Sequence, residues 1–177
     1  MDETTEDFSR LYDKFLIHCI GRRSLHLHYG VGYHSHVIPL LGSNWFTIDL
    51  ERLETEANET AGYNLILPAN YFDAVLCTGL EHIAVPELLL YDIRRGLKPS
   101  GHVWIEVSLN SPYRPIPTEY RRITPKGLRI MMRDFDEIFC AAYSPKGSPL
   151  RSMSSFYGLK RTDDPTGLSS WRSAGKD

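Results

Sequence analysis

Two glycines and an aspartate are the first residues of this chain whose types and spacing suggest a ligand site. Gly30 and Gly32 form a Gly-x-Gly turn after a short apolar stretch, and Asp49 lies 17 positions after Gly32, at the end of the next such stretch. Glycines allow a tight turn and a close approach of the backbone to a ligand. A carboxylate about 20 positions further on can accept both hydroxyls of a ribose, so the pattern indicates an adenosine-type ligand. A tight turn followed by an aspartate that caps a helix would explain the same residues.

A second group with chemical potential is Glu81-His82, which follows the apolar stretch 72–78. Because histidine titrates close to neutral pH, His82 can take a proton from a substrate hydroxyl. We therefore predict His82 as the catalytic base, with Glu81 beside the substrate. The structural alternative is that the pair only holds its loop in shape.

A proline-rich stretch, residues 111–124, carries Tyr113, Tyr120 and Arg122. The guanidinium of Arg122 can clamp a carboxylate or phosphate of a substrate. We predict these three side chains as substrate contacts. A surface salt bridge that fixes the loop is the alternative role of Arg122.

Four histidines form two His-x-His pairs, His26/His28 and His34/His36. Alternate residues of a strand share a face, so His26 and His28 could both reach one metal ion. No cysteine or well-placed carboxylate nearby in the sequence completes a ligand set. We therefore expect no metal, and we expect these histidines to pack or to line a cleft.

The elements that must position these residues follow from apolar periodicity and turn residues. We expect helices at 7–20, about 33–41, 51–58, from 86 onward, and from 125 to about 132, the last capped by Thr124. We expect strands at 25–29, 45–49, 72–78, 102–109, 136–143 and 156–160, with a turn at 99–101.

Strands that alternate with helices predict a doubly wound α/β fold, a mostly parallel sheet of about six or seven strands with helices on both faces. Ligands of such sheets bind outside the carboxyl ends of the strands. The site is therefore expected in the loops after residues 29, 49, 78 and 109.

Two longer motifs add a family resemblance. The run from Tyr71 to Gly101, YFDAVLCTGLEHIAVPELLLYDIRRGLKPSG, resembles class I S-adenosylmethionine (SAM) methyltransferases of the type 11 kind, in which Phe-Asp opens the fourth strand and Leu-Glu-His follows it. The stretch 111–128, SPYRPIPTEYRRITPKGL, is similar to a Pro-Tyr…Tyr-x-Arg-Phe-Thr-x-x-Gly-Leu segment of one branch of that family. LILPANYF, at 65–72, resembles the approach to the fourth strand. The resemblance covers roughly residues 22–160.

This resemblance implies a Rossmann-like methyltransferase fold with an antiparallel edge, and SAM as the cofactor. It implies cofactor contacts from His28, Gly30, Gly32, Asp49, Leu65, Cys77 and Thr78, catalysis by His82, and substrate contacts from Glu81, Tyr113, Tyr120 and Arg122. The expected function is methyl transfer to a small molecule or a glycan, because the segment that would recognise the acceptor is short.

The first loop departs from the family pattern of an acid followed by Gly-x-Gly-x-Gly. His26 stands at the acidic position and His28 at the first glycine. An imidazole at 28 either turns away from the cleft or fills the space of the SAM amino-acid tail. The alternative function is therefore a non-catalytic binding or partner protein that has lost SAM use. A nicotinamide-dependent Rossmann enzyme is a third option, weakened by the missing third glycine of that fingerprint, which is Ser35.

Length and composition are those of one soluble domain. The chain has 177 residues and a formal net charge of −2, which gives no electrostatic case for nucleic acid. Three cysteines without a CxxC pair favour a reducing compartment, and no signal peptide or apolar span is recognisable. We expect a cytoplasmic protein with no membrane contact, a single domain at 1–161 and a disordered tail at 162–177.

Overall fold

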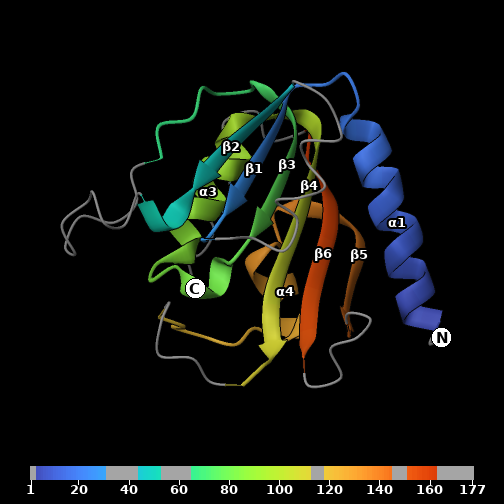
Figure 1. Cartoon of the computed structure of the whole chain (residues 1–177). Coiled ribbons are helices and arrows are strands. Elements are labelled where there is room, and N and C mark those ends of the chain that lie inside the picture. Colours follow the sequence, from blue (N-terminus) through green and yellow to red (C-terminus); the bar gives the residue numbers. More distant parts are fainter. Residues whose placement is uncertain (1–2, 31–43, 53–64, 113–117, 145–150, 163–177) are drawn as a thin grey trace, which may run out of the picture.

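The computed structural model describes residues 3–30, 44–52, 65–112, 118–144 and 151–162. Six strands in these ranges form one sheet in the order β2-β1-β3-β4-β6-β5 (Figure 1). The strands are β1 (Ser24–His28), β2 (Trp45–Asp49), β3 (Phe72–Thr78), β4 (Leu97–Asn110), β5 (Phe135–Tyr143) and β6 (Ser152–Lys160). The helices are α1 (Glu3–Cys19), the 3₁₀ turn η2 (Leu80–His82), α3 (Pro86–Gly96) and α4 (Pro125–Met131).

The directions of the strands confirm the predicted architecture. β1 pairs in parallel with β2 and β3, and β3 pairs in parallel with β4. β6 runs antiparallel to both β4 and β5, which gives the expected antiparallel edge. The carboxyl ends of β1 to β4 therefore lie along one edge of the sheet, where the connecting loops can meet.

Side-chain alternation along the strands gives the sheet two apolar faces. On one face Val75 and Cys77 belong to a core that includes Leu89 of α3 and Leu128 of α4. On the other face, Phe8 and Phe15 of α1 pack against three aromatic side chains of the sheet, those of Trp104, Tyr143 and Tyr157. Helices thus cover both faces, as the alternation of strands and helices predicted.

Several elements have the predicted bounds. The strands expected at 45–49 and 72–78 are β2 and β3, and α3 begins at Pro86. The cap of α4 is also confirmed, because the Thr124 hydroxyl accepts a hydrogen bond of 3.1 Å from the amide of Gly127.

The prediction of a separate turn at 99–101 before a strand at 102–109 is wrong. β4 starts at Leu97 and pairs with β3 on both sides of this segment, through Leu97 with Phe72 and through His102 with Ala74. The turn is an irregularity within the strand, with Ser100 at a φ of 59°. Local turn chemistry was read correctly, but pairing with β3 extends the strand across it.

Two other boundaries move outward. α1 begins at Glu3 rather than at residue 7, and acidic residues suit the start of a helix. β6 begins at Ser152 rather than at 156, because Ser154 is buried and its hydroxyl donates to the carbonyl of Ile123. Three predictions lie outside the described residues. They are the helix expected at 33–41, the part of the helix expected at 51–58 that follows residue 52, and the tail at 163–177. None of the helices in the described ranges combines the length and apolar character that a membrane crossing needs.

Two glycines give a matched test of this packing. A Cβ on Gly158 of β6 would lie 2.7 Å from the carbonyl oxygen of Asp136 and 2.7 Å from a ring carbon of Phe156. We expect Gly158→Ala to lower the free energy of unfolding by about 1–3 kcal/mol, because the clash lies in a packed interior. Urea denaturation of the variant and the wild type measures the difference.

Gly127→Ala is the control for that prediction. A Cβ on Gly127 of α4 would meet its nearest neighbour, the Thr124 hydroxyl, at 3.5 Å, an ordinary contact. Alanine is the better helix former, so this variant should gain up to about 1 kcal/mol. Equal stability of Gly158→Ala and the wild type would contradict the packing of β6 described here.

Candidate functional site

The loops after β1 and β2 are joined by Asp49. His28 and Asp49, the last residues of these strands, are paired across the sheet. Asp49 Oδ1 accepts hydrogen bonds from the amide of Gly30 at 3.1 Å and from the amide of Glu51 at 3.0 Å. Within the described part of the chain Oδ2 accepts none. Asp49 therefore fixes the turn after β1 and caps the helical residues 50–52 with one oxygen, as the alternative reading of this aspartate expected, and Oδ2 is a candidate ligand group.

Gly30 is a position that requires glycine. Its φ is 62°, and a Cβ there would lie 3.0 Å from Oε2 of Glu51. A side chain would be both strained and crowded. The predicted role of Gly30 as a tight turn is confirmed, whereas Gly32 lies outside the described residues.

His28 is held by its own loop. Its Nδ1 donates to the carbonyl of Gly30 at 2.5 Å, and its half-buried ring lies 5.0 Å from the ring of His26. Because a carbonyl only accepts, Nδ1 carries the proton and Nε2 of the neutral ring is an acceptor. The imidazole at the first glycine position is therefore tied to its own loop.

The last two residues of β3, Cys77 and Thr78, point to opposite faces of the sheet. Cys77 is fully buried in the core toward α3, and this burial raises the pKa of its thiol. Leu65 is also buried in that core, so Cys77 and Leu65 can reach a cofactor only through their backbone. Thr78 points to the opposite face, and its buried hydroxyl has no hydrogen-bond partner among the described residues. Buried hydroxyls are normally paired, which makes Thr78 a candidate ligand contact.

Sequence analysis missed the role of Tyr29. Gly79, just after β3, has a φ of 89°, and a Cβ on it would lie 2.6 Å from Cβ of Tyr29. The ring of Tyr29 then stacks on the imidazole of His82, with centroids 4.7 Å apart and planes at 27°. The loop after β1 thus reaches the loop after β3 through one aromatic side chain.

His82 is fixed by a backbone carbonyl. Its Nδ1 donates to the carbonyl of Thr118 at 2.8 Å, so Nε2 of the neutral ring has the lone pair. The ring is half-buried. This arrangement is suited to a base that acts through Nε2.

Glu81, next in sequence, is almost fully buried, with 7% of its surface exposed. Burial raises the pKa of its carboxyl group, and Oε2 has no hydrogen-bond partner within the described ranges. Its backbone carbonyl accepts from the amide of Tyr120 at 3.0 Å. The backbone of Glu81 therefore holds the loop, as the structural alternative expected, and its carboxyl group lies inside the site.

The loop after β4 docks on this region. Arg122 donates to the carbonyl of Ser111 at 2.5 Å and to Glu119 at 2.7 Å, which is the loop-fixing role given above as its alternative. Arg121, which the sequence did not single out, donates to the carbonyl of Ala84 at 2.6 Å. Tyr120 is 53% exposed, and Tyr113 lies outside the described residues.

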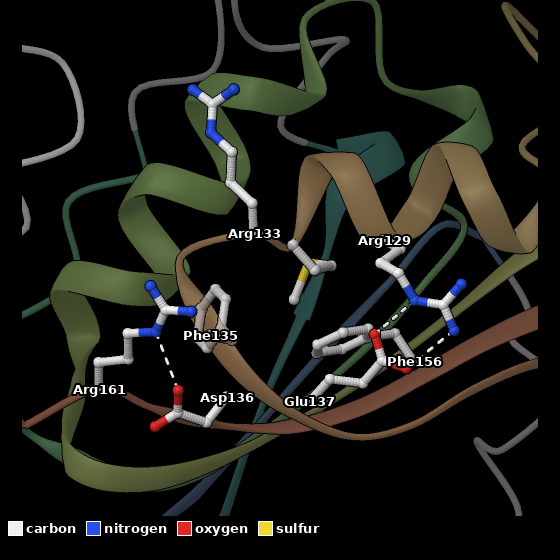
Figure 2. Close-up of a pocket in the computed structure, with 8 residues that line it drawn as sticks. Arg129, Arg133, Phe135, Asp136, Glu137, Phe156 and Arg161 are labelled. Atoms are coloured by element: carbon white, nitrogen blue, oxygen red, sulfur yellow. Dashed lines mark hydrogen bonds and ion pairs between the residues drawn. The ribbon is translucent and has the colours of Figure 1, made fainter. Parts of the chain in front are cut away.

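A pocket of about 380 Å³ lies elsewhere, between α4 and the start of β5 (Figure 2). Two ion pairs line it, Arg129 with Glu137 and Arg161 with Asp136. None of the predicted site residues contributes to it. Among the described residues no three His, Cys, Asp or Glu side chains come together as a metal ion would require.

Comparisons with known proteins agree with this geometry. A family model described as a methyltransferase domain, of type 11, matches residues 27–105. No curated protein matches the chain. Similar solved structures include a putative methyltransferase from Bacillus halodurans, with a TM-score of 0.62 and 11% identity, covering 88% of this chain and 99% of the other.

Two further structures show the range of proteins with this fold. One is 1,6-didemethyltoxoflavin-N1-methyltransferase from Burkholderia thailandensis with bound S-adenosylhomocysteine, at TM-score 0.60 and 18% identity, covering 88% of this chain and 83% of the other. Another is the [4+2]-cyclase SpnF, at TM-score 0.57 and 14% identity, covering 86% and 80%. Identities this low establish the fold. The family model covers β1 from Leu27, β2, β3 and the first part of β4, so the chain is similar to the class I SAM-dependent methyltransferases over the strands and loops of the candidate site.

Proposed function

We propose that this protein is a SAM-dependent methyltransferase of a small molecule or a glycan and that His82 is the base for the transfer. The observation that carries the proposal is the fixed tautomer of His82, whose Nδ1 donates to the carbonyl of Thr118. The short acceptor segment after β4 and the net charge of −2 favour a small acceptor over a protein or a nucleic acid. Because the same fold also serves a [4+2]-cyclase, the residues of the site, not the fold, must support the reaction.

The residues at the carboxyl edge fit SAM. Asp49 Oδ2 can accept from ribose hydroxyls while Oδ1 holds Gly30. The buried hydroxyl of Thr78 lacks a partner in the described part of the chain and can pair with the cofactor. When bound, SAM supplies a methyl group on a sulfonium that is already electrophilic.

The chain itself then has two tasks, to align the acceptor and to take up its proton. Nε2 of His82 can accept a proton from the acceptor hydroxyl or amine, while Nδ1 keeps its hydrogen bond to Thr118. The loop 118–122 closes over this base through the contacts of Tyr120 with Glu81 and of Arg121 with Ala84. Such positioning lowers the barrier by holding the reacting groups in line.

Substrate contacts are proposed from the same loop. Tyr120 is exposed at the site and offers a ring and a hydroxyl. Glu81 offers a buried carboxyl group whose Oε2 has no described partner. Arg122 already uses its guanidinium on Ser111 and Glu119, so its contact with the acceptor would be shared with this loop-fixing role.

Removal of the Asp49 carboxylate should weaken cofactor binding. We expect Asp49→Ala to reduce the affinity for S-adenosylhomocysteine by about 1–3 kcal/mol, because hydrogen bonds to a charged group are lost. Asp49→Asn should lose less, since its amide oxygen can still accept from Gly30. Calorimetric titration measures both variants. Asp136→Ala, which removes a carboxylate at the opposite edge of the sheet, is the control. An Asp49→Ala variant that binds as the wild type does would refute this role.

His28→Gly tests whether the histidine at the first glycine position blocks the pocket. Because His28 is tied to the carbonyl of Gly30, we expect the pocket to be open and the affinity for SAM to change by less than about tenfold, or about 1.4 kcal/mol. Titration of the variant and the wild type decides the matter. A gain in affinity far above tenfold would mean that the natural chain is a binding protein with an obstructed cofactor site.

His82→Gln should remove the base and keep the fold. We expect the turnover of a small-molecule or sugar acceptor to fall about 100-fold or more, with the affinity for S-adenosylhomocysteine unchanged. Formation of S-adenosylhomocysteine against a panel of acceptors measures turnover, and His102→Gln, at the far edge of the sheet, is the control. Full turnover by His82→Gln would rule out this base.

A further inference from the structure

Tyr29 lies between the cofactor loop and the base, at a position that the Gly-x-Gly-x-Gly pattern leaves open. Its backbone is fixed on both sides, since His28 pairs with Asp49 across the sheet and the amide of Gly30 donates to Asp49 Oδ1. The Cα–Cβ direction of Tyr29 is therefore set by the carboxylate that is proposed above as the ribose contact.

Gly79 makes room for this side chain. A Cβ on Gly79 would lie 2.6 Å from Cβ of Tyr29 and 3.3 Å from its backbone nitrogen, distances that no other residue type could tolerate without a shift. The first and third loops thus touch at this point. The ring of Tyr29 passes over Gly79 and stacks on His82, the last residue of η2.

The stacked rings restrain the base in a way that its hydrogen bond cannot. The bond from Nδ1 of His82 to the carbonyl of Thr118 fixes one ring atom, and the imidazole plane can still tilt about that bond. Tyr29 covers one face of the plane, with centroids 4.7 Å apart, within the range of aromatic pairs. Carbonyl and ring together define both the tautomer and the direction of Nε2.

We propose that Tyr29 is a positioning residue that orients Nε2 of His82 and links occupancy of the cofactor loop to the base. This role rests on the proposed function of His82. A ligand that engages Asp49 and the Gly30 turn acts on the backbone of Tyr29, and the stack transmits this to the imidazole. Tyr29 need touch neither cofactor nor acceptor.

The experiment uses ¹⁵N-histidine-labelled full-length chain and long-range ¹H–¹⁵N spectra, with the His82 signal assigned by His82→Gln. In the wild type and in Tyr29→Phe we expect one His82 tautomer, protonated at Nδ1, with ring protons shifted upfield by the stacked ring. In Tyr29→Leu we expect averaged nitrogen shifts and no upfield shift. Added S-adenosylhomocysteine should move the His82 signals in the wild type and Tyr29→Phe, and leave them unmoved in Tyr29→Leu.

Two controls separate positioning from general damage. His102, whose Nδ1 is bonded to the hydroxyl of Tyr157 at the other edge of the sheet, should keep its signals in every variant. Tyr91→Leu removes an exposed tyrosine of α3 and should leave His82 unchanged.

A wild-type pattern of His82 signals in Tyr29→Leu would overturn the proposal. If Tyr29→Leu does not fold, the wild type alone still tests the stack. The shifts of the His82 ring protons are then compared between the folded and the urea-unfolded wild type, and the absence of an upfield shift in the folded chain would exclude the stack. Failure of S-adenosylhomocysteine to bind the wild type would count against the proposed function and against the link to the cofactor loop, whereas the tautomer comparison without ligand would still test whether Tyr29 orients His82.

Discussion

The hydrogen bond from the amide of Gly30 to Asp49 Oδ1 holds the first loop against the end of β2. Parallel pairing of β1 with β2 and β3 brings the strand ends to one edge, but it does not determine where the loops beyond them go. Asp49 does this for the first loop with Oδ1, and the same carboxylate is the proposed ribose contact. That bond also fixes the backbone on one side of Tyr29, and so it orients the side chain that contacts Gly79 and stacks on His82.

The same device appears twice in the site. Both His28 and His82 donate from Nδ1 to a backbone carbonyl, Gly30 for one and Thr118 for the other. A carbonyl oxygen only accepts hydrogen bonds, so Nδ1 carries the proton and each ring, when neutral, has its lone pair on Nε2. For His82 this favours proton uptake from an acceptor. For His28 it means that a histidine in place of glycine is tied into its own loop, with Nε2 as the remaining hydrogen-bond acceptor.

Buried polar groups occur both inside the sheet and at its carboxyl edge. Inside the sheet, Glu106 accepts from the indole of Trp104 and the hydroxyl of Tyr143, and Lys160 donates to Asn70 and to the carbonyl of Leu97. At the carboxyl edge, Thr78 Oγ1 and Glu81 Oε2 are buried and lack partners within the described ranges. Trp45 Nε1 at the start of β2 and Ser155 Oγ inside β6 also lack described partners, so such an atom does not by itself mark a ligand site. Thr78 and Glu81 are candidate contacts because they combine this property with a place at the carboxyl edge.

The sequence by itself determined the doubly wound sheet, the bounds of β2 and β3 and the cap of α4, because alternation, capping and turn chemistry act over a few residues. It also singled out Gly30, Asp49 and His82 as candidate site residues. Only the tertiary structure decided the continuous β4 across its turn, the burial of Cys77 and Leu65, the use of Arg122 within its own loop, and the stack of Tyr29 on His82. Each of these depends on neighbours far away in the chain or on which face of a strand meets a helix. Residue types and spacing cannot specify such contacts, since packing selects among several partners that local chemistry allows equally.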